Sequence, residues 1–532
     1  MKKTLLALLI ASSAHAAPVT LDGEHTTAAD IAAIARGETV AIADSAQARV
    51  EKSFAVLLAA AKTGQPIYGF TVGVGWNKDR TFINAQGELD QALIKASQDF
   101  NRGLIRAHVG AVGDILPAEK VRAVLATRLN MVLTGSPGLQ PAYVQTYVDM
   151  LNKNVLPVVP SKGSIGQADI TILGHTALAM IGEGDVTYQD KRMPVREAFQ
   201  QAGIKTVEPY GKDALAILST NAYSLGLAAL QSEKLAQLDR MQHLVYALSL
   251  EGLNGNVSPI LADNVAAKGF PAGIQSAKTV REHLAGSYLW QRDDNRAVQD
   301  PLSFRDGVWI LSALSEARQR AADKLAIQLN HGDDRAPDEQ PETLRRYIAG
   351  GGALFSSANF DPTPWLLDYE STTVALAHNA NASVQRLIKL NDPAFTHLSR
   401  FLGTENSYHA FGAMENPPVA LAREIQLLAN PASVASVAVA GNIEDVATNA
   451  PLAISRLETA ADDYAYILGM ELIHATQAID LRLKENPGLA LGKDTRALYD
   501  AFRQQVKFLE ADRPLSDDFA RAHDFILEYQ PK

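Results

Sequence analysis

The chain has 532 residues, of which 47% are hydrophobic and 20% are charged, and its formal net charge at pH 7 is -10. This apolar content is sufficient for a buried core, which excludes an intrinsically disordered chain. The negative charge and the lack of long basic runs argue against a nucleic-acid partner, and the absence of cysteine excludes disulfide bonds.

Residues 1–16 have the pattern of a secretory signal peptide. Lys2 and Lys3 precede an apolar run from Leu5 to Ala11, and small residues end at Ala16. The run is shorter than the ~20 residues that a membrane-spanning helix needs. We therefore predict cleavage after Ala16, a periplasmic or secreted protein, and no membrane partner. The alternative is a buried amphipathic helix at the N-terminus.

The mature chain, residues 17–532, is predicted to form one mainly α domain in two parts. Residues 17–213 are rich in turns: the glycines between Tyr68 and Gly75 predict a loop, and Asp185 to Tyr188 predicts a short hairpin. Residues 214–532 have the pattern of a long-helix bundle, with apolar side chains at three- and four-residue steps from Leu457 to Ile479. The stretch from Leu225 to Leu253 gives a similar signal.

No metal site is expected. The chain has no HExxH motif, no pair of CxxC motifs and no GxxxxGK[ST] motif, which excludes the common zinc-protease and P-loop classes. The acidic stretch at 331–338, HGDDRAPD, predicts an exposed loop with a solvated surface. A metal site there is the alternative.

A series of short motifs, collinear along the chain, is similar to the histidine and phenylalanine ammonia-lyase family. In order they are IYGFTVGVG, FNRGLIRAH, RLNMVLTGSPG, VLPVVPSKGSIG, GEGDV, VQDPLSFRDG, SSANFD, ENSYHAF and ANPASVASVAVAGNIED. The resemblance runs from about residue 30 to residue 490. It implies the mainly α long-helix bundle of that family and a homotetramer in which three subunits form each active site.

One motif departs from the family in the residues that matter most for its chemistry. The family segment GSxGASGDL contains the Ala-Ser-Gly tripeptide that cyclises into the electrophilic methylidene-imidazolone (MIO) group. Here SKGSIGQADI, Ser161 to Ile170, is one residue shorter, and the dipeptide Ser-Gly occurs nowhere in the chain. We therefore expect no cofactor.

The resemblance also assigns candidate catalytic residues. Tyr68 takes the position of the catalytic tyrosine and is the expected base for the β-proton; the alternative is a structural loop anchor. Glu444 matches the acidic residue that meets the imidazole in histidine-specific members, with a helix-cap carboxylate as the alternative. Lys389 is an added candidate for an acid, a base or an anion clamp, because a desolvated lysine shifts its pKa readily; the alternative is a solvated lysine on a helix.

Candidate substrate-binding residues follow from the same motifs. Arg305 matches the arginine that binds the substrate carboxylate, for which a planar guanidinium is suited; a surface or intersubunit ion pair is the alternative. His108 matches the pocket histidine, with a structural, hydrogen-bonded histidine as the alternative. Ser219 stands where the family has the asparagine that supports MIO. The remaining candidates, which include the parts of a cation pocket, are Gln299, Phe360, Asp361 and Asn406, with Trp365 and Tyr408 as further aromatic rings that are otherwise core residues. Leu302 replaces the second catalytic tyrosine.

These losses and retentions lead to three hypotheses. A quaternary ammonium leaves as a neutral amine and needs no electrophile, so the preferred reading is an MIO-independent carbon–nitrogen lyase. Like the ergothionases related to this family, it would expel trimethylamine from an ergothioneine-like histidine betaine. The alternatives are a conventional histidine or aromatic amino acid ammonia-lyase and a non-catalytic periplasmic protein that binds an amino acid-like ligand.

Overall fold

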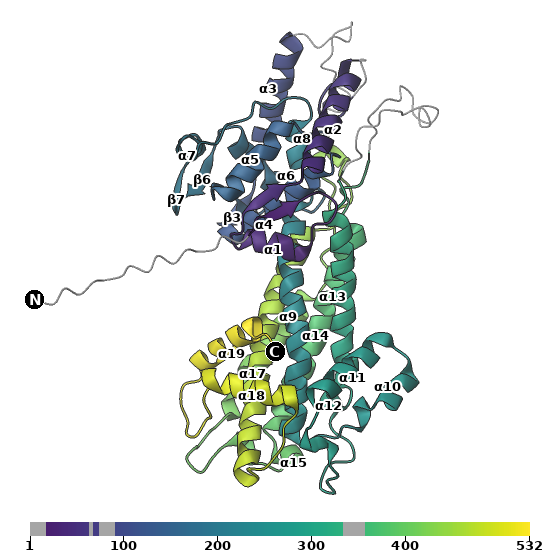
Figure 1. Cartoon of the computed structure of the whole chain (residues 1–532), viewed down its shortest axis with the longest axis vertical. Coiled ribbons are helices and arrows are strands. Elements are labelled where there is room, and N and C mark those ends of the chain that lie inside the picture. The colour runs from purple at the N-terminus through teal and green to yellow at the C-terminus, as the bar shows by residue number, and fades with distance from the viewer. Residues whose placement is uncertain (1–16, 63–66, 74–90, 334–356, 532) are drawn as a thin grey trace, which may run out of the picture.

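The computed structural model describes residues 17–62, 67–73, 91–333 and 357–531 (Figure 1). The predicted signal peptide, positions 74 and 75 of the predicted glycine-rich loop, and positions 334–338 of the predicted acidic loop lie outside these ranges.

The N-terminal part consists of short helices and three small sheets. Its helices are α1 (Ala28–Ala35), α2 (Asp44–Lys62), α3 (Gln91–Ala107), α4 (Ala118–Leu133), α5 (Pro141–Asn152), α6 (Ile170–Met180), α7 (Val195–Ala202) and α8 (Asp213–Leu218). Its strands are β1 (Val19–Leu21), β2 (Val40–Ile42), β3 (Val112–Ile115), β4 (Leu156–Pro157), β5 (Pro160–Lys162), β6 (Asp185–Tyr188) and β7 (Lys191–Pro194). β1 and β2 pair in parallel, β3 pairs antiparallel with β5, and β4, β6 and β7 form an antiparallel sheet. The β6–β7 hairpin confirms the predicted one.

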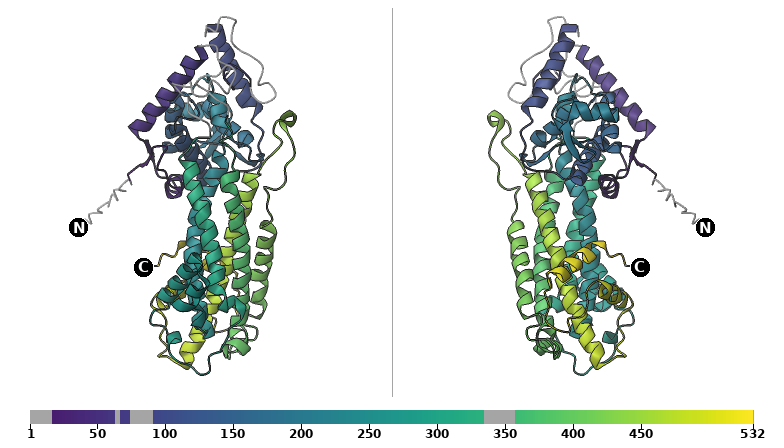
Figure 2. Two further views of the ribbon diagram at one scale, coloured as in Figure 1. Left: turned by 90° about the vertical axis from the view of Figure 1, so that its right-hand side faces the viewer. Right: turned by 90° about the vertical axis from the view of Figure 1, so that its left-hand side faces the viewer.

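The rest of the described chain is a bundle of long helices with smaller helices at its far end. The bundle helices are α9 (Ala222–Leu253), α13 (Gly307–Leu329), α14 (Thr363–Leu390), α16 (Asn416–Leu428) and α17 (Ala450–Glu485). The smaller helices are α10 (Ala262–Lys268), α11 (Pro271–His283), α12 (Leu302–Arg305), α15 (Pro393–Thr396), α18 (Lys493–Gln505) and α19 (Ser516–Glu528). Figures 1 and 2 show the N-terminal part at one end of the bundle and α10, α12, α15 and α18 toward the other.

The predicted long helices are confirmed, and burial explains both. In α17 the predicted stripe, including Leu457, Tyr464 and Leu468, is fully buried. α9 packs on α4, α13 and α17 and is buried on nearly every side, as expected for a central helix. The fold is therefore the predicted mainly α long-helix bundle.

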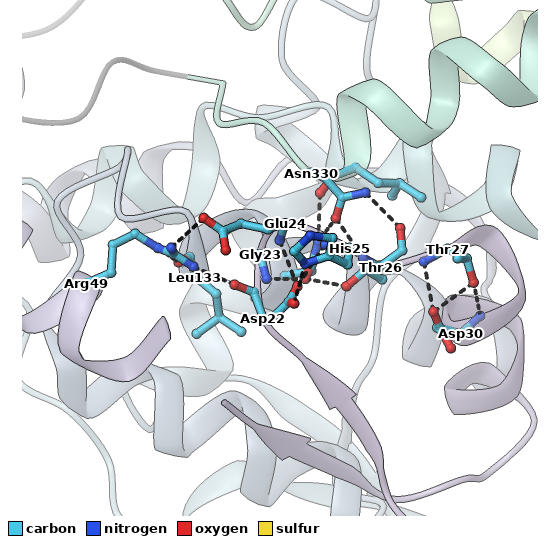
Figure 3. Close-up of polar contacts among 12 residues, drawn as sticks. Asp22, Gly23, Glu24, His25, Thr26, Thr27, Asp30, Arg49, Leu133 and Asn330 are labelled. Atoms are coloured by element: carbon cyan, nitrogen blue, oxygen red, sulfur yellow. Dashed lines mark hydrogen bonds and ion pairs between the residues drawn. The ribbon is translucent and has the colours of Figure 1, made fainter. Parts of the chain in front are cut away.

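Hydrogen bonds attach the N-terminal segment to the end of the bundle (Figure 3). Asn330, which caps the C-terminus of α13, accepts from the Thr26 amide at 2.8 Å and donates to the Thr26 carbonyl at 2.8 Å. The Arg49 side chain donates to the Leu133 carbonyl at 2.9 Å and pairs with Glu24 at 2.7 Å. The Asn330 bonds attach Thr26 to the end of α13, whereas the Arg49 contacts join segments within the N-terminal part.

One predicted surface feature is wrong. Asp333, expected on an exposed acidic loop, is 3% exposed, and its carboxylate lies 3.5 Å from the Arg128 guanidinium. Burial raises the pKa of Asp333 to about 6. The local sequence indicated a solvated surface. The ion-pair partner of Asp333, Arg128, is distant in the sequence, so the local pattern gave no sign of it. No helix within the described ranges is both long and apolar enough to cross a bilayer.

Candidate functional site

The loop that carries Tyr68 packs against the helix that ends at Ser219. Gly69 has φ +78°, and a Cβ there would lie 2.7 Å from the Leu215 side chain of α8, so only glycine allows this approach. Ser219 is the C-terminal cap of α8. The Tyr68 side chain is 46% exposed. The structure therefore places Tyr68 and Ser219 in one region, with the Tyr68 ring accessible.

His108 joins this region through the end of α3. Asn101 of α3 donates to the Gly211 carbonyl at 3.0 Å and accepts from the Ala214 amide at 2.8 Å, which binds α3 to α8. The His108 Nδ1 atom lies 2.7 Å from the Leu104 carbonyl oxygen. Because a carbonyl only accepts, Nδ1 carries the proton, and in the neutral ring Nε2 is left as an acceptor. An acceptor at this place suits the ring N–H of a heterocyclic substrate.

The shortened segment forms a tight turn beside this region. Gly166 and Ala168 both have positive φ, +82° and +56°. Asp169 is fully buried and accepts hydrogen bonds from Ser164 Oγ at 2.8 Å and from the amide and hydroxyl of Ser224, each at 2.9 Å. Burial raises the pKa of Asp169 to about 6. These bonds fix the turn between β5 and α6.

The residues of this turn do not fit the MIO group. Between Gly166 and Asp169 stand only Gln167 and Ala168, so no hydroxyl is present to be eliminated in forming a methylidene. The nearby hydroxyl of Ser164 donates to Asp169 and accepts from the Gly166 amide at 3.0 Å. It therefore serves as a structural bridge within the turn.

Phe360 and Asp361 meet the shortened turn from the start of α14. The Gln167 Nε2 atom donates to Asp361 Oδ2 at 3.4 Å. The side-chain NH2 group of Asn221 donates to the backbone carbonyl of Phe360. Asp361 Oδ1 accepts from the Thr363 amide at 2.8 Å, which fixes the carboxylate. Five of the predicted residues thus lie on segments that contact one another, and they are called here the turn group: Tyr68, His108, Ser219, Phe360 and Asp361.

Arg305 and Gln299 lie at the far end of the bundle and contact each other. Arg305 Nη1 donates to Gln299 Oε1 at 2.7 Å, and the Arg305 side chain is 36% exposed. The helix that carries Arg305, α12, is attached to α9, because the Tyr246 hydroxyl of α9 donates to the Phe304 carbonyl at 2.6 Å. The Leu302 side chain on the same helix is exposed.

Lys389 and Asn406 also lie at this far end. The Lys389 ammonium is 5.1 Å from the centre of the Phe395 ring, a cation–π contact. Lys389 follows Arg386 by one turn of α14, and Arg386 Nη1 reaches the Ser303 carbonyl of α12 at 3.4 Å. The Asn406 amide donates to Glu510 at 3.1 Å. Gln299, Arg305, Lys389 and Asn406 are called here the clamp group.

Glu444 lies before the start of α17, on the side of the turn group. Its backbone pairs with Val439, and its side chain is half-buried. Asn449, a little further on, donates its amide to the Ile165 carbonyl at 2.7 Å, so this segment touches the shortened turn.

Within one chain the turn group and the clamp group are far apart. Ser219 precedes α9, whereas Tyr246, which holds α12, lies near its other end; residues 222–246 of a helix span about 36 Å. Asp361 lies just before α14 and Lys389 lies near its other end; the helix rises about 39 Å from Thr363 to Lys389. A site with both groups therefore requires more than one copy of the chain.

The remaining candidates are divided between core and surface. Trp365 is 1% exposed and packs edge-on against Tyr369, so it belongs to the bundle core. Tyr408 is 94% exposed. Two residues beside the turn group, Gln167 and Asn221, were not among the predicted site residues. The signal for Gln167 was its place inside the altered tripeptide. Among the described residues, no group of three or more His, Asp or Glu side chains is placed to bind a metal ion.

Comparisons with known sequences give a consistent result over almost the whole chain. Residues 26–504 match the family model described as aromatic amino acid lyase. The chain is 32% identical over 474 residues to the histidine ammonia-lyase of Geobacillus kaustophilus, covering 88% of this chain and 89% of that protein. It is 29% identical over 518 residues to the histidine ammonia-lyase of Alkaliphilus metalliredigens, covering 96% and 97%.

Solved structures extend the comparison. The crystal structure of ergothionase from Treponema denticola, an ergothioneine-degrading enzyme in complex with desmethyl-ergothioneine sulfonic acid, has a TM-score of 0.85 and 36% identity to this chain, covering 96% of this chain and 98% of that one. Tyrosine aminomutase from Streptomyces globisporus has a TM-score of 0.84 and 25% identity, covering 96% and 97%.

Proposed function

The chain belongs to the aromatic amino acid lyase family and is a carbon–nitrogen lyase, and from this premise we propose that it eliminates trimethylamine from an ergothioneine-like histidine betaine without an MIO group. The observation that carries the proposal is the shortened turn, in which Gln167 and Ala168 replace the cyclising tripeptide. The similarity to the Treponema denticola ergothionase supports the choice of substrate class.

The chemistry of the leaving group explains why such an enzyme needs no electrophile. A base removes the β-proton, the C–H electron pair becomes the Cα–Cβ double bond, and the C–N bond breaks with its electron pair going to nitrogen. From a trimethylammonium group the product is neutral trimethylamine, which needs no proton. A primary amine is a poorer leaving group and requires activation.

The proposal gives each predicted residue a role. Tyr68 removes the β-proton, and its exposed ring is accessible to a substrate. Arg305, steered by Gln299, binds the carboxylate. His108 Nε2 and Glu444 accept from the heterocycle, Asp361 lies near the cation, and Lys389 acts on the far side as an acid, base or anion clamp. Phe360, Ser219 and Asn406 shape the pocket.

Assembly of several copies is part of the proposal, because one chain separates the two groups. We propose that a homotetramer brings the clamp group of one subunit to the turn group of another. Exposed aliphatic side chains support such interfaces: Val434 and Val437, near Glu444, are 81% and 79% exposed, and Val298, beside Gln299, is 87% exposed. Small-angle scattering of the purified protein gives its molecular mass in solution and tests the proposed homotetramer. A monomer would contradict it.

A substrate panel tests the function directly. Purified protein is mixed separately with ergothioneine, histidine, phenylalanine and tyrosine, and the ultraviolet absorbance of the conjugated acid product is followed. Turnover of ergothioneine alone supports the proposal, and turnover of histidine contradicts it. Binding of ligands without product in every case favours a non-catalytic binding protein.

A conventional histidine ammonia-lyase is the second candidate, favoured by the relatives of that activity at 32% and 29% identity. It requires an electrophile made from residues other than Ala-Ser-Gly, and no serine stands between Gly166 and Asp169, where the family has its cyclising tripeptide. The same panel separates the two candidates.

We also propose that the mature chain acts in the periplasm or outside the cell, because residues 1–16 have the pattern of a signal peptide. N-terminal sequencing of the protein from its native host is expected to begin at Ala17. An intact Met1 would contradict export by this route.

A further inference from the structure

Three buried side-chain oxygens next to the shortened turn have no hydrogen-bond partner among the described residues. They are Gln167 Oε1, Asn221 Oδ1 and Thr448 Oγ1. Asn221 and Thr448 are only 2% and 4% exposed. Since buried polar atoms in folded proteins are hydrogen-bonded in the large majority, three together indicate a place for a bound molecule.

Contacts between their elements place these oxygens in one neighbourhood. A Cβ on Gly166 would lie 2.9 Å from Thr448 Oγ1. Gln167 donates to Asp361, and Asn221 donates to the carbonyl of Phe360, the residue before Asp361. The shortened turn, the start of α9, the start of α14 and the segment before α17 therefore meet at this point.

The existing hydrogen bonds of the two side-chain amides determine which of their atoms are left for a ligand. Gln167 and Asn221 each spend their NH2 group on the turn before α14, so that each leaves its carbonyl oxygen without a partner. Asp361 adds a carboxylate oriented by the Thr363 amide. The neighbourhood thus presents partial and full negative charge, which suits a cation.

We propose that Gln167 and Asn221, together with Asp361, form the subsite for the cationic leaving group, and that this subsite takes a quaternary ammonium. Its methyl groups carry much of the positive charge and make C–H···O contacts to amide and carboxylate oxygens. The inference rests on the proposed function. It adds that the shortened turn has a binding role of its own: Gln167 selects for the methylated nitrogen.

Three related alcohols test the subsite by calorimetric titration of the full-length assembled protein. Choline carries a trimethylammonium group, 3,3-dimethylbutan-1-ol is its uncharged carbon analogue, and ethanolamine is its unmethylated analogue. Choline is expected to bind at least about tenfold more tightly than either of the others. Equal binding of the carbon analogue, equal or tighter binding of ethanolamine, or no binding of choline would overturn the proposal.

Variants of Gln167 then locate the effect. Gln167→Met keeps the length of the side chain and removes both dipoles, and it is expected to weaken choline binding about tenfold without changing the carbon analogue. Gln145→Met is the matched control, since Gln145 is exposed on α5 and should leave choline binding unchanged. Choline discrimination retained in Gln167→Met would exclude Gln167 from the subsite.

A second variant covers the case in which Gln167→Met does not fold. Gln167→Glu keeps an oxygen at the same place and adds negative charge, so choline should bind at least as tightly as to the parent protein. Weaker binding in a folded Gln167→Glu protein would overturn the proposal.

The subsite and the proposed function can fail separately. Turnover of ergothioneine together with unchanged choline discrimination in Gln167→Met would remove the subsite and leave the function. Selective choline binding that Gln167→Met abolishes, in a protein that turns over no betaine, would leave the subsite and remove the function.

Discussion

Arg305 and Gln299 form a hydrogen-bonded pair at the far end of the bundle, with 2.7 Å between Nη1 and Oε1. The glutamine fixes Nη1 of the guanidinium, and Nε lies 3.7 Å from the Asp306 carboxylate. Nη2 has no hydrogen-bond partner among the described residues and can donate to a carboxylate. Both side chains lie at the surface of a single chain, about the length of α9 from Ser219. The carboxylate clamp is therefore built separately from the turn that replaces the MIO precursor.

The clamp predicts the effect of Arg305→Lys. An ammonium cannot reproduce the bidentate geometry, so we expect KM for the betaine to rise about tenfold or more, with a smaller change in kcat. Arg292→Lys is the control, because Arg292 is exposed at the same end and its ion pair within the described part of the chain is with nearby Asp294 at 2.8 Å. A KM equal to that of the parent would reassign Arg305 to a structural role.

Tyr68→Phe tests the base. Removal of the hydroxyl should lower the elimination rate by at least about 100-fold, since a positioned general base contributes that much. Binding of the substrate should change little, because the carboxylate clamp is intact. Tyr188→Phe, at the end of β6, serves as the control. Unchanged turnover in the Tyr68 variant would remove Tyr68 as the base.

Tyr246 is expected to position Arg305 through the backbone of α12. Tyr246→Phe removes the 2.6 Å bond to the Phe304 carbonyl and should cost about 1 kcal/mol in the free energy of unfolding. KM should rise severalfold as α12 loosens. Tyr369→Phe removes a comparable buried bond, the 2.8 Å contact with Ser232, and should lower stability without changing KM. Equal KM values in both variants would show that Tyr246 supports only the core.

The ion pairs of His523 with Asp462 and Asp524, on the side of the bundle, predict how the stability of the protein depends on pH. His523 Nε2 lies 3.3 Å from Asp462, and its Nδ1 lies 2.9 Å from Asp524. The bond with His523 lowers the pKa of Asp462 to about 2, and the bond with Asp462 raises the pKa of His523 above its usual 6.5. The histidine's contribution is complete below pH 6.5 and is lost as pH rises through its raised pKa. The carboxylate's contribution is present above pH 3.8 and is lost as pH falls toward 2.

Urea unfolding checks this prediction. His523→Gln should lower the unfolding midpoint more at about pH 5.5 than at about pH 8.5. His331→Gln is the control, since His331 is exposed and its Nδ1 lies 2.7 Å from the Ile327 carbonyl oxygen, with no carboxylate partner among the described residues. Equal losses at both pH values would contradict the assignment of the pair.

Much of the fold could be predicted from the sequence because it rests on local periodicity. The apolar stripe that includes Leu457 and Leu468 repeats at helical spacing, and both side chains are buried as the pattern required. The short hairpin from Asp185 followed from β-forming residues ahead of a polar turn. The burial of Asp333 could not be predicted, because its ion pair with Arg128 joins positions distant in the chain.

The candidate site was predictable residue by residue but not as a geometry. Motif order identified Arg305 and Gln299, which the structure brings into contact. The distance between Asp361 and Lys389 follows from the length of α14, a helix of 28 residues that separates them. The polar contact between Gln167 and Asp361 required the tertiary fold, because the two residues come from distant segments.

The most direct measurement is the release of trimethylamine from ergothioneine in the presence of cyanide, which adds to an electrophile such as MIO and blocks it. We expect trimethylamine and the unsaturated acid to form at the same rate with and without cyanide, and histidine to give no ammonia. Ammonia release from histidine that cyanide abolishes would contradict an MIO-independent betaine lyase.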